Sequence, residues 1–294
     1  MALFGSGEPR LHKKVRRLAV RSLSRRGVSV SASNRDELRS DDGQVFLLHN
    51  LYLACADRPE SEWPSMIEVH FGRFMLGTQQ PALGEISDAE LLAQIRTRLQ
   101  PPAGPQDPVK ATYARPTFGG LVVELNRDLP TTVSWLGDES VAGRDLDFLY
   151  QVGQSNTDAE PMQTQQVDDG LTSVFGDSFF VASKTLNMRK LLSDSGLDAP
   201  YGAVFSVPHR QQAYLHPLDS GSAESVGRLA MATLRAADEP PGGRVSQETF
   251  FWFGGRVQTI SRIELLDSGE GRLTIDVEGE FAEAMQQCGA LPAH

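Results

Sequence analysis

A proline-rich stretch in the first half of the chain constrains its organisation more than any other feature. Residues 101–108, Pro-Pro-Ala-Gly-Pro-Gln-Asp-Pro, place four prolines in eight positions. Because proline fixes φ and lacks a backbone donor, this stretch favours an extended linker over a helix or a central strand. The 294 residues are enough for two moderate domains. We therefore predict an N-terminal module over 1–100, a linker over 101–108 and a C-terminal domain over 109–294.

Hydrophobic periodicity predicts both helices and strands on each side of the linker. In the N-terminal module we expect a basic helix over 10–26, strands over 28–32 and 45–48, and helices over 51–56, 61–74 and 88–99. The last of these helices begins with the capping box Ser87-Asp88-Ala89-Glu90. In the C-terminal domain we expect strands over 121–125, 132–136, 178–182, 203–207, 212–215, 250–253 and 257–260, with helices near 143–154, 188–197 and 222–234.

Two pairs of these strands have the spacing of β-hairpins. Four residues, Pro208 to Gln211, separate the first pair, and Gly254-Gly255 lies within the short turn of the second. Hairpins mixed with helices favour antiparallel sheets over a doubly wound parallel sheet. The predicted fold class is therefore α+β, with two mixed α/β subdomains joined by the proline-rich linker.

Charge is unevenly distributed along the chain. The net charge is −10, yet residues 1–39 carry ten Lys and Arg against three Asp and Glu, so the remaining chain is strongly acidic. Nucleic acid is an unfavourable partner for an acidic body, because phosphate neutralisation needs clustered basic residues. The basic helix has two open interpretations: it packs on the acidic body, or it contacts an anionic partner.

The motifs of several common functional classes are missing from the sequence. The two cysteines, Cys55 and Cys288, are too far apart for a cysteine-pair zinc motif, and the histidines have no metal-ligand spacing, so we expect no metal. The sequence contains neither a glycine-rich phosphate loop nor a nucleophile elbow, and we expect no cofactor. It also lacks an apolar run long enough to span a membrane and a secretory signal, so we expect a cytoplasmic location.

Short motifs in a shared order give the chain a resemblance to a known family. They are Leu48-His49-Asn50-Leu51-Tyr52, Leu121-Val122-Val123, Asp128-Leu129-Pro130, Ala182-Ser183, Val207-Pro208-His209-Arg210 and Phe251-Trp252-Phe253-Gly254-Gly255, together with the basic helix, the strand at Gly27-Val28 and Asn156. In this order the chain resembles the uncharacterised bacterial YtpQ-like family of unknown function. It departs from that family at Gln211, where the family has an acidic residue. The resemblance implies an architecture and leaves the function open.

One group of polar residues is a candidate site. His209 and Arg210 lie at the predicted turn of the first hairpin, and Tyr214 and His216 share a face of its outgoing strand, followed by Asp219. Two imidazoles, a guanidinium and a carboxylate can bind an anionic group or transfer protons near neutral pH. The alternative is that turns collect polar residues for backbone reasons alone.

The second candidate is the aromatic hairpin. Phe250, Phe251, Trp252 and Phe253 are consecutive, and strand alternation sends two of them to each face of the sheet. Either other elements cover both faces, or Phe251, Trp252 and Phe253 contribute to an interaction surface for a protein partner. Two functional hypotheses follow: a non-catalytic protein-interaction or accessory factor, and a hydrolase or transferase that acts on a small anionic substrate.

Overall fold

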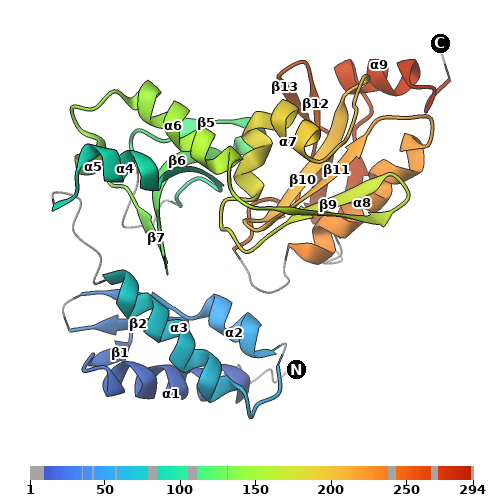
Figure 1. The fold of residues 1–294 in the computed structure, drawn as a ribbon. Helices are drawn as coiled ribbons and strands as arrows, with labels where there is room; N and C mark the ends of the chain where they lie inside the picture. Colours follow the sequence, from blue (N-terminus) through green and yellow to red (C-terminus); the bar gives the residue numbers. More distant parts are fainter. Residues whose placement is uncertain are drawn as a thin grey trace. The chain divides into compact units, whose positions relative to one another are not determined.

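The computed structural model describes residues 10–34, 36–41, 43–56, 58–78, 85–104, 111–130, 132–237, 243–265 and 271–292. The chain divides into two compact units, the first formed mainly by residues up to Gln80 and the second mainly by residues from Pro81 onward. Both units contain helices and antiparallel sheet (Figure 1), which confirms the predicted α+β class. Residues 105–108 of the predicted linker lie outside the described residues.

The first unit combines three helices with a small sheet. Its elements are α1 (Arg10–Arg25), β1 (Val30–Ala32), β2 (Glu37–Ser40), β3 (Val45–Leu47), α2 (His49–Ala56) and α3 (Trp63–Thr78). The strands form an antiparallel sheet in the order β1-β2-β3. Its core contains Leu38 and Phe46 from the sheet together with Leu51, Ile67 and Phe71 from α2 and α3. Strand β2 was not predicted from the sequence.

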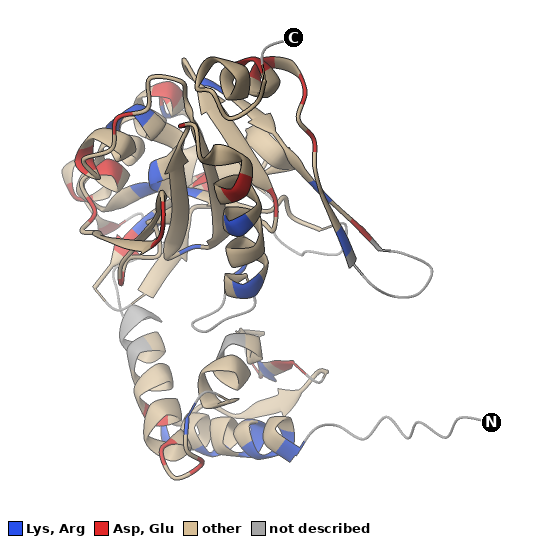
Figure 2. Ribbon diagram, turned by 90° about the vertical axis from the view of Figure 1, so that its right-hand side faces the viewer, with Lys and Arg blue, Asp and Glu red and all other residues tan. Residues whose placement is uncertain are grey.

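Helix α1 has the amphipathic character that its sequence predicts. Val15, Ala19 and Leu23 recur every four residues and are fully buried in the core of the first unit. Lys and Arg residues, coloured blue in Figure 2, recur along the same helix. Just after it, Arg26 forms an ion pair with Glu68 of α3 at 2.6 Å. The apolar face of the basic helix therefore packs within its own unit.

The second unit contains the remaining helices and strands. Its first part consists of α4 (Asp88–Gln94), β4 (Ile95–Gln100), β5 (Arg115–Pro116), the 3-10 helix η2 (Phe118–Gly120), β6 (Val122–Leu129), β7 (Thr132–Trp135), α5 (Asp138–Val141) and α6 (Leu146–Asp158). It continues with β8 (Gln163–Asp168), β9 (Leu171–Phe175), η3 (Ala182–Asn187), α7 (Met188–Asp194), β10 (Ala203–His209), β11 (Gln212–Pro217) and α8 (Ser222–Ala236). Last come β12 (Thr249–Phe253), β13 (Arg256–Thr259), β14 (Ser261–Leu265), β15 (Gly271–Ile275) and α9 (Gly279–Gln287).

The boundary between the units differs from the predicted one. The helix expected to reach Leu99 ends at Gln94, and strand β4 follows it directly. Strand β4 pairs with β6 along its whole length, from Ile95 opposite Arg127 to Gln100 opposite Val122. The predicted linker therefore connects strands of one sheet, β4-β6-β5, inside the second unit. Because Leu91, Ile95 and Leu99 fit a helical period, the sequence pattern did not reveal the strand.

A six-stranded antiparallel sheet is the centre of the second unit. Its order is β13-β12-β10-β11-β9-β8, and both predicted hairpins, β10–β11 and β12–β13, are confirmed. One face buries Phe205 and Phe250 in a core shared with α7, and the other buries Val204 and Phe251 beneath α8 and α9. Figure 1 shows α7 and α8 on opposite sides of this sheet. The strand predicted over 178–182 is wrong, because this stretch turns into η3.

Candidate functional site

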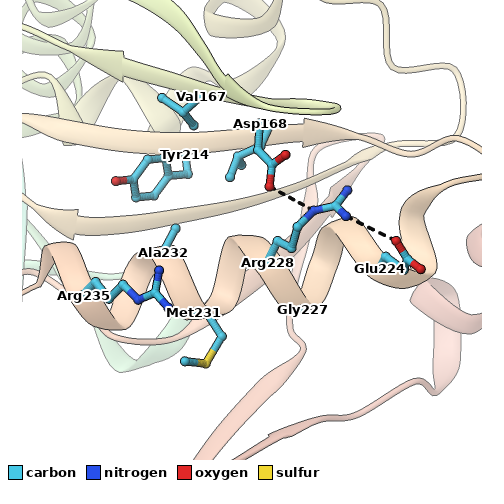
Figure 3. A pocket seen from close by; sticks show the side chains of 10 residues that line it. Val167, Asp168, Tyr214, Glu224, Gly227, Arg228, Met231, Ala232 and Arg235 are labelled. Carbon is cyan, nitrogen blue, oxygen red and sulfur yellow. Dashed lines mark hydrogen bonds and ion pairs between the residues drawn. The ribbon is translucent and has the colours of Figure 1, made fainter.

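A groove of about 730 Å³ lies between helix α8 and the β8–β9 end of the six-stranded sheet (Figure 3). Its sheet side is formed by Val167, Asp168, Leu171 and Tyr214, and its helix side by Glu224, Gly227, Arg228, Met231, Ala232 and Arg235. This volume is within the range of sites that hold a small ligand or a short peptide segment. The groove is therefore the candidate site of the second unit.

Helical periodicity determines which side chains of α8 face the groove. Val226, Leu229, Ala230 and Thr233 are buried and hold the helix against the sheet. Met231 lies outside this buried stripe and keeps 45% of its surface exposed. An apolar residue outside the apolar face of a helix is the sequence signal for this wall of the groove, and Met231 is not among the predicted site residues.

The charged wall of the groove is organised around Arg228. Its Nε lies 3.1 Å from Asp168 Oδ2 of β8, and its Nη1 lies 3.3 Å from Glu224 Oε2 on the preceding helical turn. The same guanidinium donates to the Ser225 hydroxyl at 2.9 Å. Arg228 therefore connects α8 to the end of β8. Arg235, further along the helix, pairs with no acid in the part of the chain that the structure describes.

Strand β8 forms the outer border of the groove. All six of its residues are exposed, and Val167 is the one apolar residue among them, with 46% of its surface exposed. Strand β8 is the last strand of its sheet and pairs with β9 only, among the described strands. A bulge between Gln166 and Asp168 interrupts that pairing and leaves Gln163–Gln166 in regular register. An exposed edge next to an open groove is thus available to a partner.

The structure separates the predicted polar residues into two groups. His209 and Arg210 lie at the β10–β11 turn, whereas His216 is paired with Val204 near the other end of the hairpin. The five residue-to-residue steps of extended strand from Val204 to His209 correspond to about 16 Å. The predicted set therefore does not converge on one substrate. Tyr214 lines the groove, and Asp219 is exposed beyond the strand.

His216 is held in a buried network. Its Nδ1 lies 2.7 Å from the carbonyl oxygen of Gly170, and its Nε2 lies 2.8 Å from the Ser222 hydroxyl. Because a carbonyl only accepts, Nδ1 carries the proton and Nε2 accepts from Ser222. The Ser222 oxygen in turn accepts from the backbone N–H of Asp219 at 2.8 Å. Both His216 and Ser222 have no exposed surface, so this serine–histidine pair is closed to a substrate and joins α8 to the β8–β9 turn.

His209 is also an interior residue. It keeps only 6% of its surface exposed, and its Nδ1 accepts from the backbone N–H of Gln211 at 3.4 Å. Burial lowers the pKa of His209, and it lowers the pKa of His216 in the same way. Both imidazoles are therefore biased toward the neutral form.

The aromatic hairpin is mostly part of the core. Phe250 and Phe251 are 0% and 1% exposed, which removes Phe251 from the predicted interaction surface. Trp252 is half-buried against the core shared with α7, and Phe253 keeps 39% of its surface exposed. Of the two alternatives for this hairpin, coverage of both faces by other elements therefore holds for Phe250 and Phe251.

Neither a metal site nor a membrane-spanning helix is found among the described residues. Those residues contain no cluster of His, Cys, Asp and Glu that could hold a metal ion. Among the helices that the structure describes, none is both long and apolar enough to cross a membrane. No family model, curated protein or solved structure matches the chain, so the resemblance to the YtpQ-like family stays a prediction.

Proposed function

We propose that the chain is a non-catalytic interaction protein whose second unit binds an extended segment of a protein partner. The observation that carries this proposal is the groove between α8 and the exposed edge strand β8. Extended peptides commonly bind such edges by adding a strand, with alternate side chains entering a neighbouring pocket. The segment would pair with β8 and place apolar side chains in the groove.

The unprotected character of β8 supports this mode of binding. Edge strands usually carry lysine, proline or an inward charge that blocks pairing with another chain. The sequence of β8, Gln-Thr-Gln-Gln-Val-Asp, contains neither lysine nor proline. Its bulge lies at the Asp168 end, so the stretch Gln163–Gln166 remains regular enough to pair with a further strand.

The side chains that line the groove indicate which groups of the partner segment would bind there. Val167 and Met231 are exposed apolar residues on opposite walls, and methionine adapts its shape to different apolar partners. Arg228 is already engaged with Asp168 and Glu224, whereas Arg235 can donate to a carbonyl of the segment. The acidic charge of the chain as a whole would accelerate association with a partner of basic surface.

A pair of matched variants tests this proposal. Met231→Glu places a charge in the groove, and Val277→Glu places the same charge at a residue of the same unit that is also 45% exposed. Affinity capture from an extract of the source cells, at low and high salt, would use the full-length chain as bait. We expect a defined protein to be captured by the unmodified chain and by Val277→Glu but not by Met231→Glu. Equal capture by both variants, or no captured protein at either salt, would contradict the proposal.

The alternative of a hydrolase or transferase with His209, Arg210 and His216 as its active residues has less support. His216 and Ser222 are fully buried, and His209 lies at the opposite end of the hairpin from them. No observation brings these three side chains to one substrate. Arg210 lies instead near Arg98 of β4, whose charge acts on it.

A further inference from the structure

Several side-chain N–H groups of the second unit are buried without an acceptor among the described residues. Three of them are Nε of Arg98 on β4, Nδ2 of Asn126 on β6 and Nε of Arg210 at the β10–β11 turn. Asn126 keeps only 1% of its surface exposed. Buried polar groups in folded proteins nearly always have a hydrogen-bond partner, so three orphaned donors in one unit require an explanation.

The register of β4 and β6 brings the first two donors to one face of their sheet. Arg98 is opposite Glu124 and Arg96 is opposite Asn126. Directly opposite residues point to the same face, and residues two apart on a strand do so as well. Arg98 and Asn126 are therefore diagonal neighbours on this face, within reach of a long side chain.

The 3-10 helix η3 links the β10–β11 turn, which carries Arg210, to strand β4, and the charges of Arg210 and Arg98 lie close enough to interact. The backbone carbonyl of Arg210 accepts from the N–H of Ala182 at 3.1 Å, and the hydroxyl of Ser183 accepts from the N–H of Leu99 at 2.8 Å. These two adjacent residues of η3 thus join the hairpin turn to β4. The Arg210 guanidinium stacks on the Phe179 ring at 4.3 Å, which fixes its orientation.

Arg98 and Arg210 place two positive charges near each other, and Glu124 is the acid that interacts with Arg98. Arg96, on the same face, pairs with Glu160 at 2.7 Å and with Asp128 at 3.8 Å, whereas Arg98 has no ion pair with a described residue. Glu124, opposite Arg98, accepts from Trp135 Nε1 at 3.0 Å; burial raises the pKa of this carboxyl group, and the charge of Arg98 acts in the other direction. Burial and the neighbouring charge of Arg98 lower the pKa of Arg210 to about 10, so Arg210 remains charged at neutral pH. Burial also lowers the pKa of Arg98, and the charge of Glu124 opposes that shift.

We propose that Arg98, Asn126 and Arg210 form a binding site for a small oxyanion, the phosphate or carboxylate group of a small molecule. Guanidinium groups match the geometry of such oxygens, and an amide donor adds a third hydrogen bond. Arg98 and Arg210 each retain partial exposure, so a small anion can reach them. A bound anion would satisfy the orphaned donors and relieve the repulsion between the two cations. This site shares no residue with the groove, so it stands independently of the proposed function.

Thermal unfolding and titration calorimetry of the full chain test the site. The probes are inorganic phosphate and acetate, each compared with chloride at equal ionic strength. We expect one of the two to raise the unfolding temperature of the unmodified chain, because a ligand that binds only the folded state stabilises it. A shift with phosphate alone indicates a phosphate-bearing ligand, and a shift with acetate alone indicates a carboxylate. No shift with either anion would overturn the proposal.

Variants assign the effect to these residues. Arg98→Gln and Arg210→Gln should each weaken binding of the active anion by about tenfold or more, since each removes a charged donor. Arg189→Gln, an exposed arginine of α7 that belongs to neither site, serves as the matched control and should bind normally. If Arg210→Gln does not fold, Phe179→Leu removes only the stacking partner and should also weaken binding. Unchanged affinity in Arg98→Gln, or lost affinity in Arg189→Gln, would place the anion elsewhere.

Discussion

The Nε2 of His216 lies 2.8 Å from the hydroxyl of Ser222, and neither residue has exposed surface. In an open site this pairing would be a candidate for nucleophilic catalysis. Here the second imidazole nitrogen is held by the Gly170 carbonyl at 2.7 Å, and Gly170 has a φ of 70° that keeps the turn close to the ring. The pair therefore holds the β8–β9 turn against the start of α8, and it sets one end of the groove.

This buried imidazole predicts a pH dependence of stability. Burial lowers the pKa of His216 below its ordinary value of 6.5. The unfolded chain then takes up a proton near pH 6.5 that the folded chain resists, so the free energy of unfolding falls as pH drops below about 7. His209 acts in the same direction.

Denaturant unfolding between about pH 7.5 and about pH 5.5 measures this effect. His216→Gln should be less stable at neutral pH and should show a shallower decline of the unfolding free energy with falling pH. His49→Gln, at an exposed position of the first unit, is the control and should decline as the unmodified chain does. An undiminished decline in His216→Gln would show that His216 does not carry the pH dependence.

Two arginines on the same face of β4 should respond in opposite ways to substitution. Arg96→Gln removes a partly buried ion pair with Glu160 and should lower the free energy of unfolding by about 1–3 kcal/mol. Arg98→Gln removes a partly buried cation whose desolvation and repulsion from Arg210 outweigh its attraction to Glu124, so in chloride buffer its stability should equal or exceed that of the unmodified chain. Denaturant unfolding of both variants distinguishes these effects. A loss in Arg98→Gln as large as that in Arg96→Gln would indicate that Arg98 already has its partner within the chain.

Two glycines with left-handed backbone offer a matched test of packing. A Cβ at Gly202, where φ is 91°, would lie 2.6 Å from the ring of Phe251 and from the carbonyl of Trp252. A Cβ at Gly196, where φ is 68°, meets nothing within 4 Å. We expect Gly196→Ala to cost about 1 kcal/mol of unfolding free energy from backbone strain alone, and Gly202→Ala to cost about 3 kcal/mol or more. Equal costs for the two variants would show that the contacts of Gly202 with Phe251 and Trp252 yield more easily than their packing indicates.

The sequence predicted the local hairpins well because their signals are local. Gly254-Gly255 lies in the turn between β12 and β13, and the alternation of Phe250 and Phe251 between two faces follows directly from strand geometry. The pairing of β4 with β6 could not be predicted in this way. Its partners, such as Ile95 and Arg127, are far apart in sequence, and the apolar positions of β4 also fit a helix.

The groove was less predictable than the fold. Val167 is a single apolar residue in a polar strand, and Met231 lies outside the buried face of α8, so each gives a weak signal by itself. Their juxtaposition depends on the sheet order β11-β9-β8, which places β8 at the edge and beside α8. The distribution of the predicted polar residues was hidden for the same reason, since strand register places His209 and His216 at opposite ends of one hairpin.

Backbone hydrogen exchange of the second unit, measured with and without the captured partner, tests the central claim most directly. If a partner segment adds to the edge of the sheet, amides within Gln163–Asp168 should exchange more slowly in the complex, and residues around Met231 on α8 should also gain protection. Strand β13, the edge strand at the opposite end of the sheet, should remain unchanged. Protection confined to β13 or to the first unit, with β8 unaffected, would contradict the proposed binding of a partner at the groove.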